Sequence, residues 1–150
     1  MGYSFDYFVS NLKCPVCAAI SEADNSTNMQ TYIRDEPELA NLGVGYPLKI
    51  ETETMEDKHY LIIKLPQPLE EIRILDIWEC PTCGYPFNWA EIVVIGGFIN
   101  RVDAVSLNRE VFEKANFISR ECISVVAELT GRSFSDLAKT DLVKILRERL

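Results

Sequence analysis

Two short segments with the same pattern, Cys14-Pro15-Val16-Cys17 and Cys80-Pro81-Thr82-Cys83, constrain this chain more than any other feature. A C-x-x-C turn brings two sulfur atoms close enough to bind one metal ion, and backbone N–H groups pointing back at them stabilise the thiolate charge. Proline after the first cysteine restricts φ and stiffens each turn. Two such pairs supply four sulfur ligands, so the sequence predicts a closed, tetrahedral Cys₄ site.

The residue after each pair differs. Gly84 follows the second pair and permits the positive φ that often comes after the second cysteine of such a turn. Ala18 follows the first pair, and that turn is expected to close without the freedom of glycine.

The repeated Cys-Pro-x-Cys, with Gly84 after one copy, resembles the zinc knuckles of zinc-ribbon and rubredoxin-like domains. The resemblance covers the two knuckles and their flanking strands, about a third of the chain. It implies that a structural Zn²⁺, with iron less favoured, is bound by four ligands: Cys14, Cys17, Cys80 and Cys83. The sixty-two residues 18–79 that separate the pairs exceed the spacing of a compact ribbon, so we expect much of the domain to be built between them.

Other chemistry for the cysteine pairs remains open at this point. A redox dithiol of thioredoxin type would place one pair before a helix, whereas turn-rich or strand-like sequence follows both pairs here. A disulfide across C-x-x-C is strained, and nothing in the chain suggests secretion. Iron suits a tetrahedral sulfur site as zinc does. The fifth cysteine, Cys122, is expected to be a buried small hydrophobe, and the only histidine, His59, a surface residue of a strand.

Length and composition indicate one soluble domain. A chain of 150 residues with 47% hydrophobic residues is long enough for a sizeable core. No apolar run of about 18 residues occurs, so no membrane span is expected. The N-terminus lacks the basic start and apolar stretch of a signal peptide. A reducing, cytoplasmic location is therefore expected, and it suits free thiolates.

The net charge of −8 is unevenly distributed. Residues 1–60 carry ten acidic and four basic side chains, whereas residues 106–150 carry seven and eight. A nucleic-acid surface requires clustered lysine and arginine, and none is evident outside Arg147-Glu148-Arg149. The composition disfavours nucleic acid as a partner and is compatible with a basic protein partner.

The hydrophobic pattern predicts strands first and helices later. The expected strands are 29–34, 48–54, 60–65, 72–79, 91–95 and 98–107. A turn at 56–58 is expected to join 48–54 to its partner 60–65, and Gly96-Gly97 is expected to join the last two strands as a hairpin. A helical turn is expected within 35–42, and helices are expected at 107–115, at 120–129 ending at Gly131, and in a final segment from 137 to 146 after a capping box at Ser133. The predicted fold is α+β, a single domain 1–150 with an antiparallel β body in 1–105, a zinc-ribbon-like Cys₄ site, and two or three helices in 106–150.

The sequence around the second cysteine pair is rich in aromatic residues, namely Trp78, Tyr85, Phe87 and Trp89. They could pack around the metal turn and shield the thiolates from water, or they could form an exposed contact patch. Sequence alone does not separate these two arrangements.

No set of residues suggests an active site, and we expect a protein that is not an enzyme. There is no Ser/His/Asp set and no nucleotide-binding fingerprint. The leading hypothesis is a zinc-stabilised protein-binding module, an acidic inhibitor or immunity-type protein for a basic partner, because surface acid steers a cationic partner and aromatic residues anchor it. A nucleic-acid- or transcription-associated zinc ribbon and a rubredoxin-like electron carrier are the two alternatives.

Overall fold

The main sheet grows around a hairpin in the middle of the chain. In this computed structural model, which describes residues 5–34, 39–67 and 71–150, β5 (Ile72–Trp78), β6 (Asn88–Ile95) and β7 (Phe98–Val105) form an antiparallel meander. Gly96 and Gly97, both with positive φ, form the tight turn between β6 and β7. The predicted hairpin at this turn is thereby confirmed.

Two further strands complete the main sheet in the order β4-β8-β5-β6-β7. β8 (Phe117–Ser119) runs parallel to β5 and antiparallel to β4 (Tyr60–Ile62). Residues 106–150, expected to be helical, therefore contribute a strand to the interior of the sheet. Three residues between helical segments are too few for an alternating pattern, so the sequence pattern did not reveal β8.

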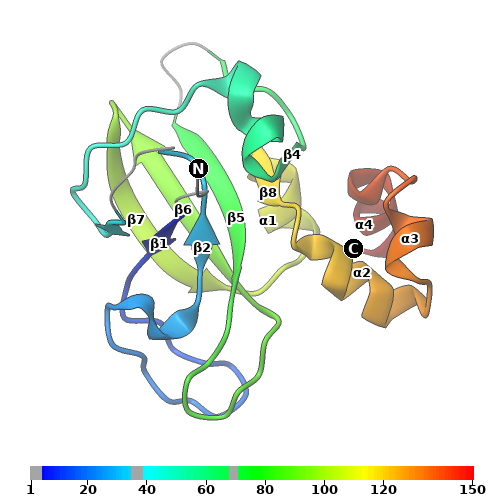
Figure 1. The fold of residues 1–150 in the computed structure, drawn as a ribbon, viewed down its shortest axis with the longest axis horizontal. Helices are drawn as coiled ribbons and strands as arrows, with labels where there is room; N and C mark the ends of the chain where they lie inside the picture. Colours follow the sequence, from blue (N-terminus) through cyan, green and yellow to red (C-terminus); the bar gives the residue numbers. More distant parts are fainter. Residues whose placement is uncertain (1–4, 35–38, 68–70) are drawn as a thin grey trace.

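A small sheet lies in front of the main sheet in the view of Figure 1. Its order is β2-β1-β3, built from β1 (Asp6–Phe8), β2 (Gln30–Thr31) and β3 (Asn41–Leu42). β1 is antiparallel to β2 and parallel to β3. Of the predicted strand at 29–34, only residues 30–31 are thus a strand.

Alternation along the central strands divides the hydrophobic core into two parts. One part packs with the small sheet and includes Phe8, Ile74 and Ile92. The other part packs with the helices and includes Leu75, Trp89 and Ile118. Neighbouring residues such as Ile74 and Leu75 point to opposite faces, so burial on both faces explains why β5 and β6 carry apolar residues on each face.

The helices follow local capping signals. They are η1 (Asn25–Thr27), η2 (Thr52–Lys58), α1 (Arg109–Lys114), α2 (Cys122–Thr130), α3 (Phe134–Leu137) and α4 (Leu142–Arg149). Ser133 caps α3 by accepting a hydrogen bond from the Asp136 N–H, and Gly131 ends α2 at φ 68°. Both signals were predicted. Among the described residues, every helix is too short or too polar to cross a bilayer.

Three predicted elements differ from the structure. The strand at 48–54 is wrong, because Thr52–Lys58 forms η2 around the buried side chain of Met55, and β4 pairs with β8 instead. The predicted final helix from 137 to 146 is interrupted, because Asp141 starts α4 as an N-cap. Of the expected helical turn within 35–42, residues 35–38 lie outside the described part, and residues 41–42 form β3.

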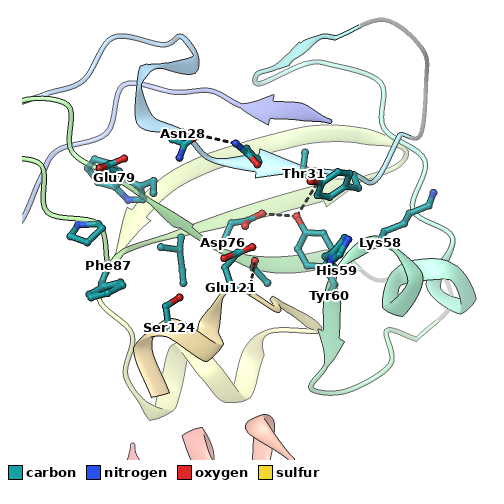
Figure 2. Close-up of a pocket in the computed structure, with 16 residues that line it drawn as sticks. Asn28, Thr31, Lys58, His59, Tyr60, Asp76, Glu79, Phe87, Glu121 and Ser124 are labelled. Carbon is teal, nitrogen blue, oxygen red and sulfur yellow. Dashed lines mark hydrogen bonds between the residues drawn. The ribbon is translucent and has the colours of Figure 1, made fainter. Parts of the chain in front are cut away.

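A buried chain of hydroxyl and carboxyl groups joins the two sheets. The Tyr60 hydroxyl lies 2.6 Å from Asp76 Oδ2 and 2.9 Å from Thr31 Oγ1, so β4 is linked to β5 and to β2 (Figure 2). All three side chains are almost completely buried. Burial raises the pKa of Asp76 to about 7, although hydrogen bonds from Tyr60, Ile77 and Ser119 oppose the shift.

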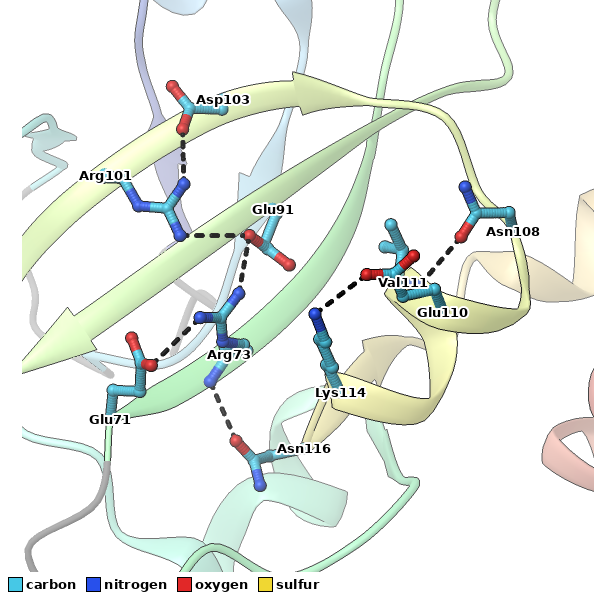
Figure 3. A network of polar contacts seen from close by, with 10 residues as sticks. All are labelled: Glu71, Arg73, Glu91, Arg101, Asp103, Asn108, Glu110, Val111, Lys114 and Asn116. Carbon is cyan, nitrogen blue, oxygen red and sulfur yellow. Dashed lines mark hydrogen bonds and ion pairs between the residues drawn. The ribbon is translucent and has the colours of Figure 1, made fainter.

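A network of ion pairs lies on the face of the main sheet that also carries the helices (Figure 3). Glu91 Oε1 lies 3.2 Å from Arg73 Nη1 and 3.4 Å from Arg101 Nη2. Arg73 also pairs with Glu71, and Arg101 pairs with Asp103. Each arginine on this face therefore has two carboxylate partners, and this part of the surface is not a free basic patch.

Candidate metal centre

The first cysteine pair lies in a short hairpin, the first knuckle (residues 12–21). Leu12 N–H donates to Ser21 Oγ at 2.9 Å, and Ser21 N–H donates back to the Leu12 carbonyl at 2.9 Å. Lys13 and Ile20 form an antiparallel bridge inside this hairpin. β1 leads into the knuckle, so the small sheet determines where the first two sulfur atoms lie.

The second cysteine pair lies at the tip of the β5–β6 hairpin, in the second knuckle (residues 79–87). Trp78 and Asn88 are the last paired residues before this tip. Glu79 N–H donates to the Thr27 carbonyl at 2.9 Å, which ties the tip to η1. The main sheet thus determines where the second pair of sulfur atoms lies.

The two knuckles have the same backbone hydrogen bonds. Cys14 N–H donates to the Ala19 carbonyl and Ala18 N–H donates to the Cys14 carbonyl, each at 2.9 Å. The corresponding bonds of the second knuckle are 3.0 Å and 2.8 Å, from Cys80 to Tyr85 and from Gly84 to Cys80. The two turns are therefore equivalent in their backbone structure, although glycine follows only the second pair.

Ala18 and Gly84 occupy equivalent left-handed positions, with φ of 64° and 77°. A Cβ atom disfavours this conformation by about 1–2 kcal/mol. Ala18 therefore closes its turn in the conformation that Gly84 adopts without strain.

Exchanging alanine and glycine at these two positions should change stability in opposite directions. We expect Ala18→Gly to raise the free energy of unfolding of the metal-loaded protein by about 0.5–1 kcal/mol. We expect Gly84→Ala to lower it by about 1–2 kcal/mol, through φ alone, because a Cβ at Gly84 would meet no atom within 4 Å. Urea unfolding measures both. A shift of both variants in the same direction would contradict this assignment of strain.

The structure brings all four cysteine sulfur atoms of the two knuckles within 4.8 Å of one another. The Cys14 and Cys83 sulfur atoms are 3.7 Å apart, and those of Cys17 and Cys80 are 3.6 Å apart. A tetrahedron with metal–sulfur bonds of about 2.3 Å has sulfur–sulfur edges of about 3.8 Å. These four residues could therefore hold one metal ion, in a site of zinc-ribbon type.

The neighbouring groups shift the pKa values of the thiols in different directions. Burial would raise the pKa of Cys14, but hydrogen bonds from the N–H groups of Cys17 and Val16 and from the neighbouring Cys83 and Cys80 thiols together lower it to about 6. The N–H group of Tyr85 lowers the pKa of Cys83, but burial and the three neighbouring sulfur atoms raise it to about 12. Four thiolates this close repel one another, and a divalent cation bound between them would compensate this repulsion.

Asn88 is a functional candidate that the sequence analysis missed. It is buried at the start of β6, and its Nδ2 lies 3.7 Å from Cys14 Sγ as a donor. Among the described residues its Oδ1 has no hydrogen-bond partner. Such donors orient metal-bound thiolates and reduce their charge. The only sequence signal was a polar residue at the start of a strand that is mainly apolar.

Removing the Asn88 amide should weaken metal binding. We expect Asn88→Ala to lower metal affinity by about 10- to 100-fold, the usual effect of losing an outer-shell hydrogen bond. Competition with a chromophoric chelator measures the affinity. The matched control is Asn116→Ala, because Asn116 is an equally buried amide that bonds Arg73 N–H and the Lys64 carbonyl, remote from the sulfur atoms. Equal loss of affinity in both variants would mean a general effect of destabilisation.

The remaining cysteine and the histidine lie outside the sulfur cluster. All five cysteines are free thiols, and Cys122 is completely buried among the residues of the second core part, as expected. His59 is exposed and ends η2 with φ 68°, directly before β4. Neither residue belongs to the group that could hold a metal.

The four aromatic residues near the second knuckle divide into two groups. Trp78 and Trp89 are buried, and Trp78 Nε1 donates to the Trp89 carbonyl at 3.0 Å. Tyr85 is 40% exposed, and its ring meets that of Phe87 edge to face with centroids 6.0 Å apart. Trp78 packs in the same core part as Cys14 and Cys80, Trp89 packs in the core part on the helix side, and only Tyr85 is exposed, with Phe87 half-buried beside it.

The fold and the site together define an α+β protein with a cluster of four cysteines that could stabilise it through a metal ion. Comparison with known proteins finds no family model, no curated protein and no solved structure that matches this chain. The function is therefore inferred from the chemistry of the residues.

Proposed function

We propose that this protein is a non-catalytic, zinc-stabilised protein-binding module whose partner is a basic protein, as in an inhibitor or immunity-type interaction. The observation that carries the proposal is the exposed ring of Tyr85, which packs edge to face on the half-buried Phe87, on a turn that a metal ion would make rigid, in a protein of net charge −8. Rigid aromatic residues are effective anchors in interfaces, and surface acid accelerates encounter with a cationic partner.

The donor set supports a structural role for the metal. Four cysteines fill a tetrahedral coordination sphere and leave no position for substrate or water. Zinc is the ion we propose. Iron in the same site would support the alternative of an electron carrier. One observation favours that alternative: Cys17 and Cys83 are exposed, so the site lies near the surface. A colourless protein with about one zinc per chain would exclude it, and a red, iron-containing protein would replace our proposal.

The charge distribution supports a protein partner over nucleic acid. Arg73 and Arg101 lie on the same face of the sheet, but both are paired with carboxylates. Binding of a phosphate backbone requires cationic groups that are free to replace counterions. We therefore propose a basic protein, and a transcription-associated role stays the second hypothesis.

Capture of the partner from the native cell, followed by measurements with the purified pair, tests the proposal. We expect a basic protein whose affinity falls at least about tenfold between about 0.05 and 0.5 M salt, because salt screens exposed charges. Tyr85→Ala should weaken binding, whereas Phe98→Ala should not, since Phe98 is an exposed aromatic residue at the β6–β7 turn, away from the knuckles. A neutral or acidic partner with salt-independent affinity would refute the proposal.

A further inference from the structure

A cavity of about 280 Å³, the carboxylate pocket, opens beside the buried hydroxyl–carboxyl chain (Figure 2). Segments from β2, β4, β5, the second knuckle and the start of α2 line it. Three carboxylate residues lie in its lining, namely Asp76, Glu79 and Glu121. The pocket is distinct from the sulfur cluster, since no cysteine lines it.

The acidic side chains of the pocket have no cationic partner in the described part of the protein. Within those residues, none of the three carboxylates forms an ion pair, although many other acidic side chains do. Lys58 also lines the pocket, but its ammonium group donates to the Ile33 carbonyl at 2.6 Å. The lining therefore holds three carboxyl groups against one ammonium group, and within the described residues that ammonium group forms no ion pair with any of the three.

The ionised form of Asp76 is unfavourable, because the side chain is 2% exposed and lies close to Glu121. Tyr60, Ser119 and the Ile77 N–H satisfy its hydrogen bonds, but they carry no charge. The negative charge of Glu121 acts on Asp76 by repulsion, in the direction that favours protonation. A buried carboxylate without a counter-charge is unfavourable, so a bound cation would stabilise this part of the fold.

The size and the walls of the pocket favour an organic cation over a metal ion. In the described residues, the cysteine cluster is the only group of three or more metal-ligating side chains close enough to share one ion. The volume is near the lower end for small-molecule sites. Aromatic rings of Tyr32, His59 and Phe87 line it, with Tyr32 and His59 centroids 4.8 Å apart. Aromatic faces attract ammonium and guanidinium groups.

We propose that the carboxylate pocket binds an organic cation, a guanidinium or alkylammonium group, which pairs with Glu121 and Asp76 and packs against Tyr32 and Phe87. This site goes beyond the proposed function, because it would also bind a free amine in the absence of any protein partner. If no partner binds in a salt-dependent way, the proposed cation site is unaffected. If no cation binds, the proposed role of Tyr85 in partner binding is unaffected.

The test is a titration of the ¹⁵N-labelled, metal-loaded protein with N-acetyl-arginine amide. We expect saturable shifts of the amide signals of residues 58–60 and 119–121, and none with N-acetyl-citrulline amide, which has a similar shape but no charge. Glu121→Gln should weaken binding by about tenfold, the effect of losing one ion pair of moderate strength. This variant should fold normally, because the Glu121 side chain makes no capping hydrogen bond.

The matched control is Glu128→Gln, an exposed glutamate two turns along the same helix, which should bind like the wild type. A titration with agmatine distinguishes the source of the cation. If agmatine binds more tightly than N-acetyl-arginine amide, the natural ligand is a free amine. If it binds more weakly, the natural ligand is a protein side chain. Either result supports the site. No binding of either cation, equal binding of the citrulline compound, or wild-type affinity in Glu121→Gln would overturn the proposal.

Discussion

Replacing Cys80 with serine should remove the bound metal and most of the folding stability. Structural zinc contributes about 10–16 kcal/mol in small Cys and His sites, which is comparable with the whole stability of a typical domain. Because the two knuckles belong to different sheets, the ion would join segments that are far apart in the sequence. We expect a loss of about 5 kcal/mol or more, and a melting temperature lower by at least about 10 °C.

Metal content and thermal unfolding of the same preparations measure this effect. The matched control is Cys122→Ala, which removes a buried thiol whose pKa burial raises to about 12 and which lies outside the sulfur cluster. That variant should lose about 1–2 kcal/mol and keep one metal per chain. Chelation of the wild-type metal should reproduce the Cys80→Ser result. A Cys80→Ser protein with wild-type metal content and melting temperature would refute the Cys₄ site.

The second large effect is a pH dependence that Asp76 creates. Its pKa is raised to about 7 by burial, whereas the unfolded chain has a value near 3.9. The folded protein therefore holds this proton more tightly, and its stability falls as pH rises from about 4 to about 7. The full difference corresponds to about 4 kcal/mol. Tyr60 and Glu121 are the titratable groups that act on Asp76 directly.

Asp76→Asn should remove this dependence. Between pH 5 and pH 8 we expect the variant to gain about 2–3 kcal/mol relative to the wild type, even though it loses part of one hydrogen bond at every pH. Both proteins are compared with saturating zinc, so that protonation of the metal ligands affects them equally. Asp103→Asn, at an exposed carboxylate paired with Arg101, should keep the wild-type slope. If the free energies of unfolding of wild type and Asp76→Asn change with pH in parallel, the buried Asp76 carboxyl is not the cause of the pH dependence.

The elements that the sequence predicted well depend on local interactions. The turn at Gly96-Gly97 and the α2 terminus at Gly131 both use positive φ, which glycine adopts without strain. The cap at Ser133 is a bond between residues three apart. In contrast, the predicted strand at 48–54 alternates as a strand should, but within the described residues only its first residue, Leu48, bonds to the β6–β7 turn, at the Gly97 carbonyl. Local bonds such as Thr54 N–H to the Glu51 carbonyl form η2 from its second half.

In the candidate site, too, features that depend on local sequence were predicted and features that depend on distant segments were not. Cys14, Cys17, Cys80 and Cys83 were predicted from spacing alone, because metal ligation imposes a short and recognisable pattern on each pair. Asn88 and the carboxylate pocket were not predicted. Asp76, Glu121 and Phe87 are far apart in the chain, and only the pairing of β5 with β8 and the return of β6 after the second knuckle bring their segments together.

The sequence by itself determined the two cysteine turns, the glycine that closes the second of them and the caps of the later helices, because these depend on bonds within a few residues. The tertiary structure decided that the two turns meet, with β1 delivering one and the β5–β6 hairpin the other. It also decided which aromatic residues are exposed and where acidic groups surround a cavity. Those features depend on which faces of the strands become buried, and burial is a property of the assembled sheets and helices.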